Sequence, residues 1–153
     1  MSRFFTAFVA LVVSAMPALA EGLPLKVVVA GETRVVSMEE LESIGVSGFR
    51  TTTTWTDGAQ EFTGVLLSDI ATANSVSTGT VIVKAINDYQ AEIELAEIMS
   101  APVLLATRMN GERMSVRDKG PYWVVYPRDD HPEFADERHN FKWVWQVDSL
   151  EFK

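Results

Sequence analysis

The alternation of apolar and polar residues along the chain predicts a mostly β domain. Short β-branched or alternating runs bounded by turn residues are typical of strands. The predicted strands are residues 25–30, 33–36, 49–55, 80–86, 91–95, 103–109, 112–114, 122–126 and 143–152. The turn sequences Gly31-Glu32 and Asn110-Gly111 each separate two of these runs and predict hairpins. We therefore expect an α+β fold in which mixed sheets of about eight or nine strands predominate.

Two segments of the chain predict short helices. Ser37 followed by Glu40 forms a capping box, which predicts a helix over residues 38–44 that ends at Gly45. Apolar residues recur at helical spacing over residues 66–74, which predicts a helix packed on a sheet. We expect two or three short helices in all, and periodicity does not determine the order of the strands.

The first 20 residues have the form of an export signal. Arg3 provides a short basic start, residues 4–17 are largely apolar, and Ala18-Leu19-Ala20 has the small-x-small form of a cleavage site. No apolar run reaches the roughly 18 to 20 residues that span a bilayer. We therefore predict a signal peptide at 1–20 and a mature periplasmic domain at 21–153 without membrane insertion; a retained N-terminal anchor is the alternative.

Composition narrows the range of functions. The chain has 13 basic and 21 acidic residues, a formal net charge of −8. An acidic surface repels phosphate backbones and anionic lipids, which argues against nucleic-acid binding. The chain contains no cysteine, so an exported form has no disulfide and depends on packing for its stability.

Four stretches of the mature chain, taken in order, carry a resemblance. They are residues 51–55 with 62–70, 85–89 with 91–95, 102–106 with 109–112, and 117–127. The last contains Arg117-Asp-Lys-Gly-Pro-Tyr-Trp123, and residues 142–145 also fit the pattern. Together they resemble the oxidoreductase molybdopterin-binding domain superfamily, which has the sulfite-oxidase fold. The resemblance implies a single domain of that type over residues 21–153, with the Arg117–Trp123 segment as its pterin-side loop.

The resemblance also identifies a missing metal ligand. The molybdenum enzymes of the superfamily hold the metal through a cysteine shortly before the tryptophan that corresponds to Trp55. Here that interval is a run of four threonines, Thr51 to Thr54, with Thr51 as the nearest counterpart. A threonine hydroxyl stays protonated at neutral pH and binds soft metals weakly. We therefore expect a reduced pterin without molybdenum as the ligand, rather than molybdopterin.

A flat heteroaromatic ring with a polar edge requires aromatic faces and fixed polar groups in its site. The candidate pterin contacts are Thr51, Thr53, Trp55, Asn87, Asp88, Tyr89, Arg117, Lys119, Tyr122 and Trp123. The aromatic residues would stack on the ring, and the amide and carboxylate would bind its edge. The two cations would suit a carbonyl, hydroxyls or a phosphate tail.

Each aromatic or threonine candidate also has an ordinary structural explanation. The aromatic rings fit core packing. Because neighbours in a strand face opposite ways, one of Tyr122 and Trp123 is expected in the core. The threonine run fits plain strand sequence.

The polar candidates have such explanations too. Asn87 and Asp88 are common turn residues, and residues 117–119 fit a solvated charged turn. His131 and His139 lie in a polar stretch whose spacing matches no familiar metal-ligand pattern, so that stretch is interpreted as a mobile acidic loop.

The resemblance, together with the missing cysteine, implies a binding protein rather than an enzyme. The chain shows no supported Ser-His-Asp arrangement and no phosphate-binding glycine-rich loop. It resembles the small exported pterin-binding sensors of the superfamily, which are non-enzymatic partners of membrane signalling proteins. We expect it to regulate the periplasmic domain of a membrane-bound partner, either a cyclic di-GMP enzyme or a histidine kinase. Two alternatives remain: a molybdopterin-dependent oxidoreductase, or a subunit of one, with a non-cysteine metal environment, and an interaction module that retained only the fold.

Overall fold

The computed structural model describes residues 22–153, and the predicted signal peptide lies outside this range. The strands are β1 (Leu25–Val29), β2 (Glu32–Val36), β3 (Ser47–Thr51), β4 (Gln60–Leu66), β5 (Thr80–Ala85), β6 (Gln90–Glu94), β7 (Leu104–Met109), β8 (Glu112–Arg113), β9 (Trp123–Val125) and β10 (Val147–Phe152). The helices are α1 (Met38–Glu42), α2 (Leu67–Ala73) and α3 (Leu95–Ser100), with 3-10 helices η1 (Pro132–Ala135) and η2 (Glu137–Lys142).

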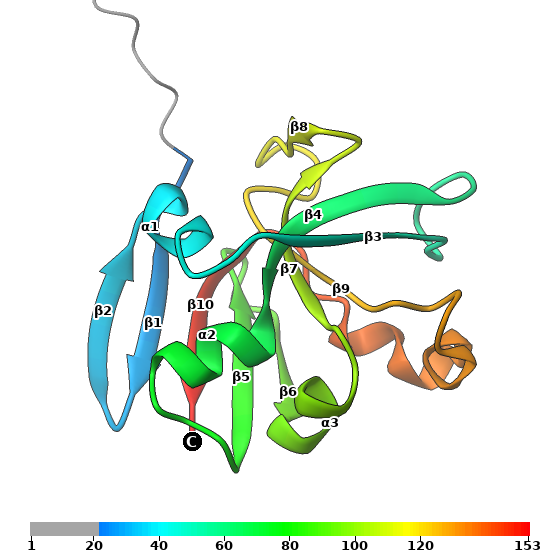
Figure 1. Ribbon diagram of the computed structural model, residues 1–153. Coiled ribbons are helices and arrows are strands. Elements are labelled where there is room, and N and C mark those ends of the chain that lie inside the picture. Colours follow the sequence, from blue (N-terminus) through cyan, green and yellow to red (C-terminus); the bar gives the residue numbers. More distant parts are fainter. Residues whose placement is uncertain (1–21) are drawn as a thin grey trace, which may run out of the picture.

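The strands form two sheets of five strands each. The first has the order β2-β1-β10-β5-β6, in which β1 and β10 are parallel and the other pairs are antiparallel. The second has the order β3-β4-β7-β8, with β9 paired to the first half of β7, and all its pairs are antiparallel. Figure 1 shows β3 and β4 crossing above the upright strands of the first sheet. The predicted α+β fold with mixed sheets and short helices is confirmed.

Two hairpins and one helix cap that the sequence predicts are present in the structure. The predicted β1–β2 hairpin is present, but its turn residues are Ala30 and Gly31 rather than Gly31 and Glu32; their φ angles are 50° and 82°, as a two-residue turn of this kind requires. The Ser37 hydroxyl accepts a hydrogen bond from the backbone N–H of Glu40 at 3.1 Å and caps α1. The Asn110-Gly111 turn joins β7 and β8 as expected.

Two elements that the sequence did not predict are β4 and α3. The interior of β4 contains Gly64, which ordinarily weakens a strand pattern. Here the glycine is needed, because a Cβ at this position would lie 2.1 Å from the Leu105 carbonyl oxygen of the neighbouring strand β7. Helix α3 has six residues, too few for a helical period to show clearly.

Three predicted segments differ most from the structure in their bounds or character. The strand expected over 49–55 ends at Thr51, because the chain then turns and Thr52 binds the Asp129 carboxylate through its backbone N–H at 2.9 Å. The strand expected from residue 143 begins at Val147. The polar stretch interpreted as a mobile loop contains η1 and η2, and it is anchored by the buried side chain of Phe134.

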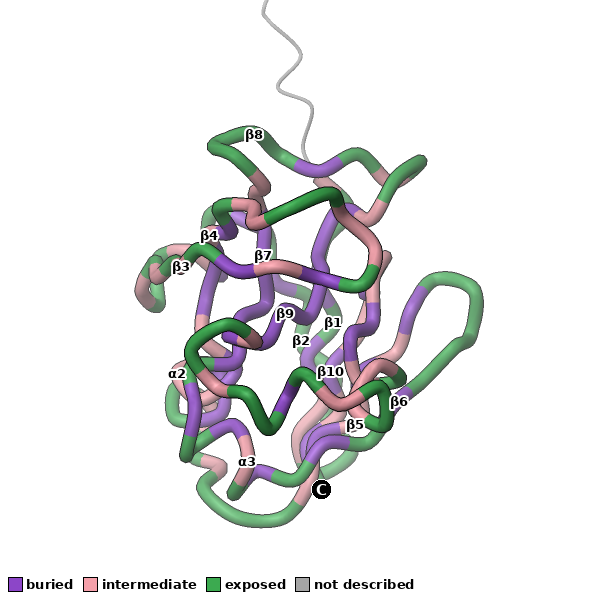
Figure 2. The backbone as a smooth tube through the Cα atoms, turned by 90° about the vertical axis from the view of Figure 1, so that its right-hand side faces the viewer, coloured by how far each residue is buried: buried purple, intermediate pink, exposed green. Residues whose placement is uncertain are grey.

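Buried segments occur in strands of both sheets and along β9 (Figure 2), and their apolar side chains form one hydrophobic core. Strand β9 is covered on both faces, and the side chains from Tyr122 to Tyr126 are all fully buried. One of Tyr122 and Trp123 was expected in the core, and both are there, because alternation separates core from solvent only where one face of a strand is exposed. Within residues 22–153, no helix combines the length and the apolar character that crossing a bilayer requires.

Candidate functional site

The four tryptophans of the chain gather in one cluster. Trp55 is at its centre, with its ring centroid 6.3 Å from that of Trp123, 5.8 Å from Trp143 and 5.4 Å from Trp145. The rings meet edge to face or tilted, which are the favoured geometries of aromatic pairs. Trp123 is fully buried, whereas Trp55 and Trp145 are half-buried and present apolar surface to solvent.

Backbone pairing brings these rings together. Trp123 in β9 forms an antiparallel bridge with Trp145, and the backbone N–H of Val124 donates to the Val144 carbonyl at 2.8 Å. The Trp123 Nε1–H donates to the Trp143 carbonyl at 3.3 Å. Residues 143–145 therefore run beside β9, which places Trp143 and Trp145 next to Trp123.

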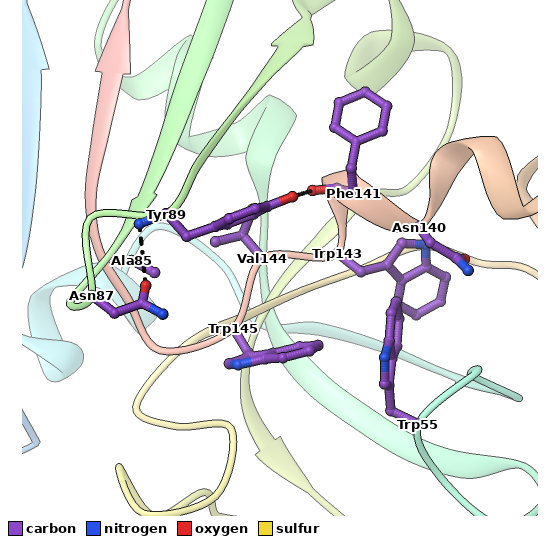
Figure 3. Close-up of a pocket in the computed structure, with 9 residues that line it drawn as sticks. All are labelled: Trp55, Ala85, Asn87, Tyr89, Asn140, Phe141, Trp143, Val144 and Trp145. Atoms are coloured by element: carbon purple, nitrogen blue, oxygen red, sulfur yellow. Dashed lines mark hydrogen bonds between the residues drawn. The ribbon is translucent and has the colours of Figure 1, made fainter.

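A cavity of about 350 Å³ opens beside the tryptophan cluster. Its lining residues are Trp55, Ala85, Asn87, Tyr89, Asn140, Phe141, Trp143, Val144 and Trp145. Figure 3 shows Tyr89 and Trp145 on opposite sides of the cavity, with Trp143 and Trp55 closing one end. The volume lies at the lower end of the range of small-molecule sites, about 300 to 1,000 Å³, which suits a bicyclic ring.

The turn between β5 and β6 supplies one wall of the cavity. The Asn87 side-chain oxygen accepts a hydrogen bond from the backbone N–H of Tyr89 at 3.1 Å, which holds the turn. The Tyr89 hydroxyl donates to the Phe141 carbonyl at 2.8 Å. This bond joins two walls that lie 52 residues apart in the sequence.

The polar groups of the cavity are uncharged. Its lining contains the amides of Asn87 and Asn140 but no lysine, arginine, aspartate or glutamate. Asn87 is exposed and Asn140 is half-buried, so both side-chain amides are open to solvent and to a ligand. An amide offers both donors and an acceptor. The cavity can therefore bind the edge of a neutral heteroaromatic ring while the aromatic side chains cover its faces.

Three of the ten candidate contacts line this cavity: Trp55, Asn87 and Tyr89. Asp88, between the last two, is not a lining residue. Its side chain is 86% exposed and pairs with Lys84 at 2.8 Å. The hydrogen bond and charge of the Lys84 ammonium group lower the pKa of the Asp88 carboxyl.

The two threonine candidates, Thr51 and Thr53, hydrogen-bond backbone groups near the cavity and do not line it. Thr51 is fully buried, and its hydroxyl accepts a hydrogen bond from the backbone N–H of Asp129 at 3.2 Å. The Thr53 hydroxyl accepts from the backbone N–H of Trp55 at 3.0 Å and bonds the Thr56 hydroxyl at 2.9 Å. Neither side chain lines the cavity. Both hold the turn that presents Trp55.

The cationic loop lies outside the cavity lining. The Arg117 side chain is exposed, and the Lys119 ammonium group stands 5.4 Å from the centroid of the Trp123 ring and 3.2 Å from Asp118. The loop contacts the cavity wall through Gln146, whose backbone N–H donates to the Lys119 carbonyl at 3.0 Å. Neither cation is therefore part of the cavity lining.

Tyr122 and Trp123 also lie outside the lining. The Tyr122 hydroxyl donates to the Leu23 carbonyl at 3.0 Å, and burial raises its pKa to about 12. Trp123 packs beneath Trp55 and Trp143 and supports them. Both residues are parts of the core.

Residues 140–145, which provide five of the nine lining residues, were not among the candidates. A signal for them was present, because 142–145 fits the superfamily pattern and contains two aromatic residues that alternate with apolar or basic ones. The strand interpretation of 143–152 assigned those tryptophans to a sheet rather than to a cavity.

Residues 50–144 match the family described as the oxidoreductase molybdopterin binding domain. The match covers more than half of the chain and includes every lining residue except Trp145, so the chain belongs to this family. Members of the family bind a pterin-type cofactor, molybdopterin. No curated protein matches the chain.

The residues present do not fit the molybdenum ligation of the family's enzymes. The chain has no cysteine to supply a thiolate. Thr51, the nearest counterpart by sequence resemblance, is fully buried, and its hydroxyl accepts a hydrogen bond from the Asp129 backbone. Within residues 22–153, no group of three or more histidine, aspartate or glutamate side chains is arranged to hold a metal ion. The cavity, in contrast, fits a flat ring by its size and its aromatic lining.

Proposed function

We propose that this chain is a periplasmic, non-enzymatic pterin-binding protein that regulates a membrane-bound signalling partner. One observation carries the proposal: a domain of the molybdopterin-binding family, without the cysteine ligand, retains a cavity lined by three tryptophans, a tyrosine and two amides. The aromatic faces suit stacking on a pterin ring. The amides of Asn87 and Asn140 suit its donor and acceptor edge.

The binding half of the proposal is tested by titration of a reduced pterin, such as a tetrahydropterin, into the purified protein. Because three tryptophans line the cavity, occupancy should quench the intrinsic fluorescence in a saturable way, with about one ligand per chain. An unchanged emission together with no heat of binding would exclude pterin recognition.

The regulatory half rests on the family resemblance and the predicted export signal. The ligand would change how the chain acts on the periplasmic domain of a cyclic di-GMP enzyme or a histidine kinase. Deletion of the chain should then alter the cellular cyclic di-GMP level or the phosphorylation of the kinase. Unchanged values of both, in cells that produce the pterin, would contradict a regulatory role.

The uncharged lining predicts selectivity against phosphorylated pterins. A phosphate drawn toward this cavity loses hydration without gaining a cationic partner, and the chain has a formal net charge of −8. A pterin phosphate should therefore bind at least about tenfold more weakly than the same pterin without phosphate. Competitive titration of the two compounds measures this ratio. Equal or tighter binding of the phosphate would instead place Arg117 or Lys119 at the ligand.

Elemental analysis separates the proposal from the oxidoreductase alternative. We expect protein from molybdenum-replete cells to contain molybdenum far below one atom per chain, because no thiolate can ligate it. Stoichiometric molybdenum with metal-dependent redox activity would overturn the non-enzymatic assignment.

A further inference from the structure

The Glu97 carboxylate links helix α3 to residues 140–145, which form one wall of the cavity (the 140–145 wall). Glu97, in α3, accepts a hydrogen bond from the Tyr126 hydroxyl on one oxygen at 2.7 Å and from the Lys142 ammonium group on the other. The Lys142 and Glu97 side chains are only 13% and 18% exposed. Solvent and salt therefore screen this pair less than a surface pair.

Both residues that donate to Glu97 contact residues that line the cavity. Lys142 lies between the lining residues Phe141 and Trp143, and its ammonium group stands 5.8 Å from the Phe141 ring centroid. The Tyr126 ring packs against the Trp143 ring, with centroids 5.7 Å apart. Glu97 is thus linked to residues 140–145 in two ways. It pairs directly with Lys142, and it bonds Tyr126, whose ring packs on Trp143.

Trp143 depends on this support for its position. Its Nε1 is buried and has no hydrogen-bond partner within residues 22–153, so the indole is oriented by packing alone. Three rings contact it: Trp55, Trp123 and Tyr126. Of these three residues, Tyr126 has a hydroxyl, and that hydroxyl donates to the Glu97 carboxylate.

We propose that Glu97 is a positioning residue for the ligand cavity. Through Lys142 and Tyr126 it holds the 140–145 wall in the shape that binds the ring, and it does not itself line the cavity. The role in binding rests on the proposed pterin function. The ordering of the wall does not require any ligand.

The chain contains a matched control for this carboxylate. Glu42, in α1, also accepts from one hydroxyl, that of Thr107 at 2.8 Å, and pairs with one cation, Arg108. The Glu42 side chain is 17% exposed, close to the value for Glu97. Glu42 does not line the cavity. Glu42→Gln therefore reproduces the loss of a half-buried carboxylate away from the ligand wall.

The first readout is the dissociation rate of a reduced pterin from the full chain, followed by stopped-flow tryptophan fluorescence. Glu97→Gln should raise this rate by about tenfold, which corresponds to about 1.4 kcal/mol. Glu42→Gln should leave it unchanged. If Glu97→Gln does not fold, Lys142→Met removes the same ion pair while keeping the apolar stem, and it should raise the rate in the same direction. Equal dissociation rates in wild type and the Glu97 or Lys142 variant would overturn the proposal.

The second readout uses no ligand. Amide hydrogen exchange over residues 140–145 should be faster in Glu97→Gln than in wild type or Glu42→Gln. If the wild type binds no pterin, the proposed function fails, and this exchange alone decides whether Glu97 orders the wall. Unchanged exchange in Glu97→Gln overturns the positioning role in either case.

Discussion

Replacement of Trp145 by alanine should lower pterin affinity by about one to two orders of magnitude. Trp145 faces Tyr89 across the cavity, and stacking of a flat base on an aromatic side chain contributes about 1–3 kcal/mol. Because Trp145 is half-buried and lies before the start of β10, its truncation should leave the sheets intact. Isothermal titration calorimetry with a reduced pterin measures the change.

The control for Trp145→Ala is Tyr122→Phe. Tyr122 is fully buried outside the cavity, so loss of its hydroxyl removes only the hydrogen bond to the Leu23 carbonyl. That loss should cost about 1 kcal/mol of stability and leave pterin affinity unchanged. If Tyr122→Phe weakened binding as much as Trp145→Ala, the ligand would lie at the Arg117–Trp123 segment and not in this cavity.

Replacement of Trp123 by alanine should lower the free energy of unfolding by about 3–5 kcal/mol. Its fully buried ring contacts Phe62 at a centroid distance of 5.4 Å as well as Trp55 and Trp143. Since small domains are stable by only about 5–15 kcal/mol, the variant should be marginal and should lose its ligand with its fold. Urea denaturation followed by circular dichroism measures the loss.

Trp123→Phe distinguishes this supporting role from direct ligand contact. Phenylalanine keeps a ring against Phe62 and Trp55 but lacks the Nε1–H that donates to the Trp143 carbonyl. Its destabilisation should be smaller, with pterin binding retained. A stable Trp123→Ala protein that fails to bind pterin would show instead that Trp123 contacts the ligand.

Local sequence signals predict those parts of the fold that local interactions determine. The capping box at Ser37 and the Asn110-Gly111 turn involve groups a few residues apart, and both are confirmed. Strand β4 was missed because the reason for Gly64 lies in another strand, where the Leu105 carbonyl leaves no room for a Cβ. Contacts of that kind do not appear in the periodicity of one segment.

The lining residues of the cavity also divide into those that the sequence identified and those that it did not. Trp55, Asn87 and Tyr89 were identified from the sequence and line one cavity, although whether they bind a pterin stays a prediction. The 140–145 wall was missed because its side chains converge through pairing with β9, far away in the chain. Arg117 and Lys119 were expected near the ligand as cations in a family-like loop. Neither lines the cavity, and the backbone of their loop accepts hydrogen bonds from Gln146, so whether they contact a ligand stays a prediction.

The central claim is that this domain binds a pterin without molybdenum, and the pterin content of protein purified from its native cells tests it most directly. The extracted ligand should show pterin fluorescence after oxidation, in about equimolar amount to the chain, with no phosphate and no stoichiometric molybdenum. Protein that carries no pterin and has no affinity for tetrahydropterins or neopterins would contradict the account.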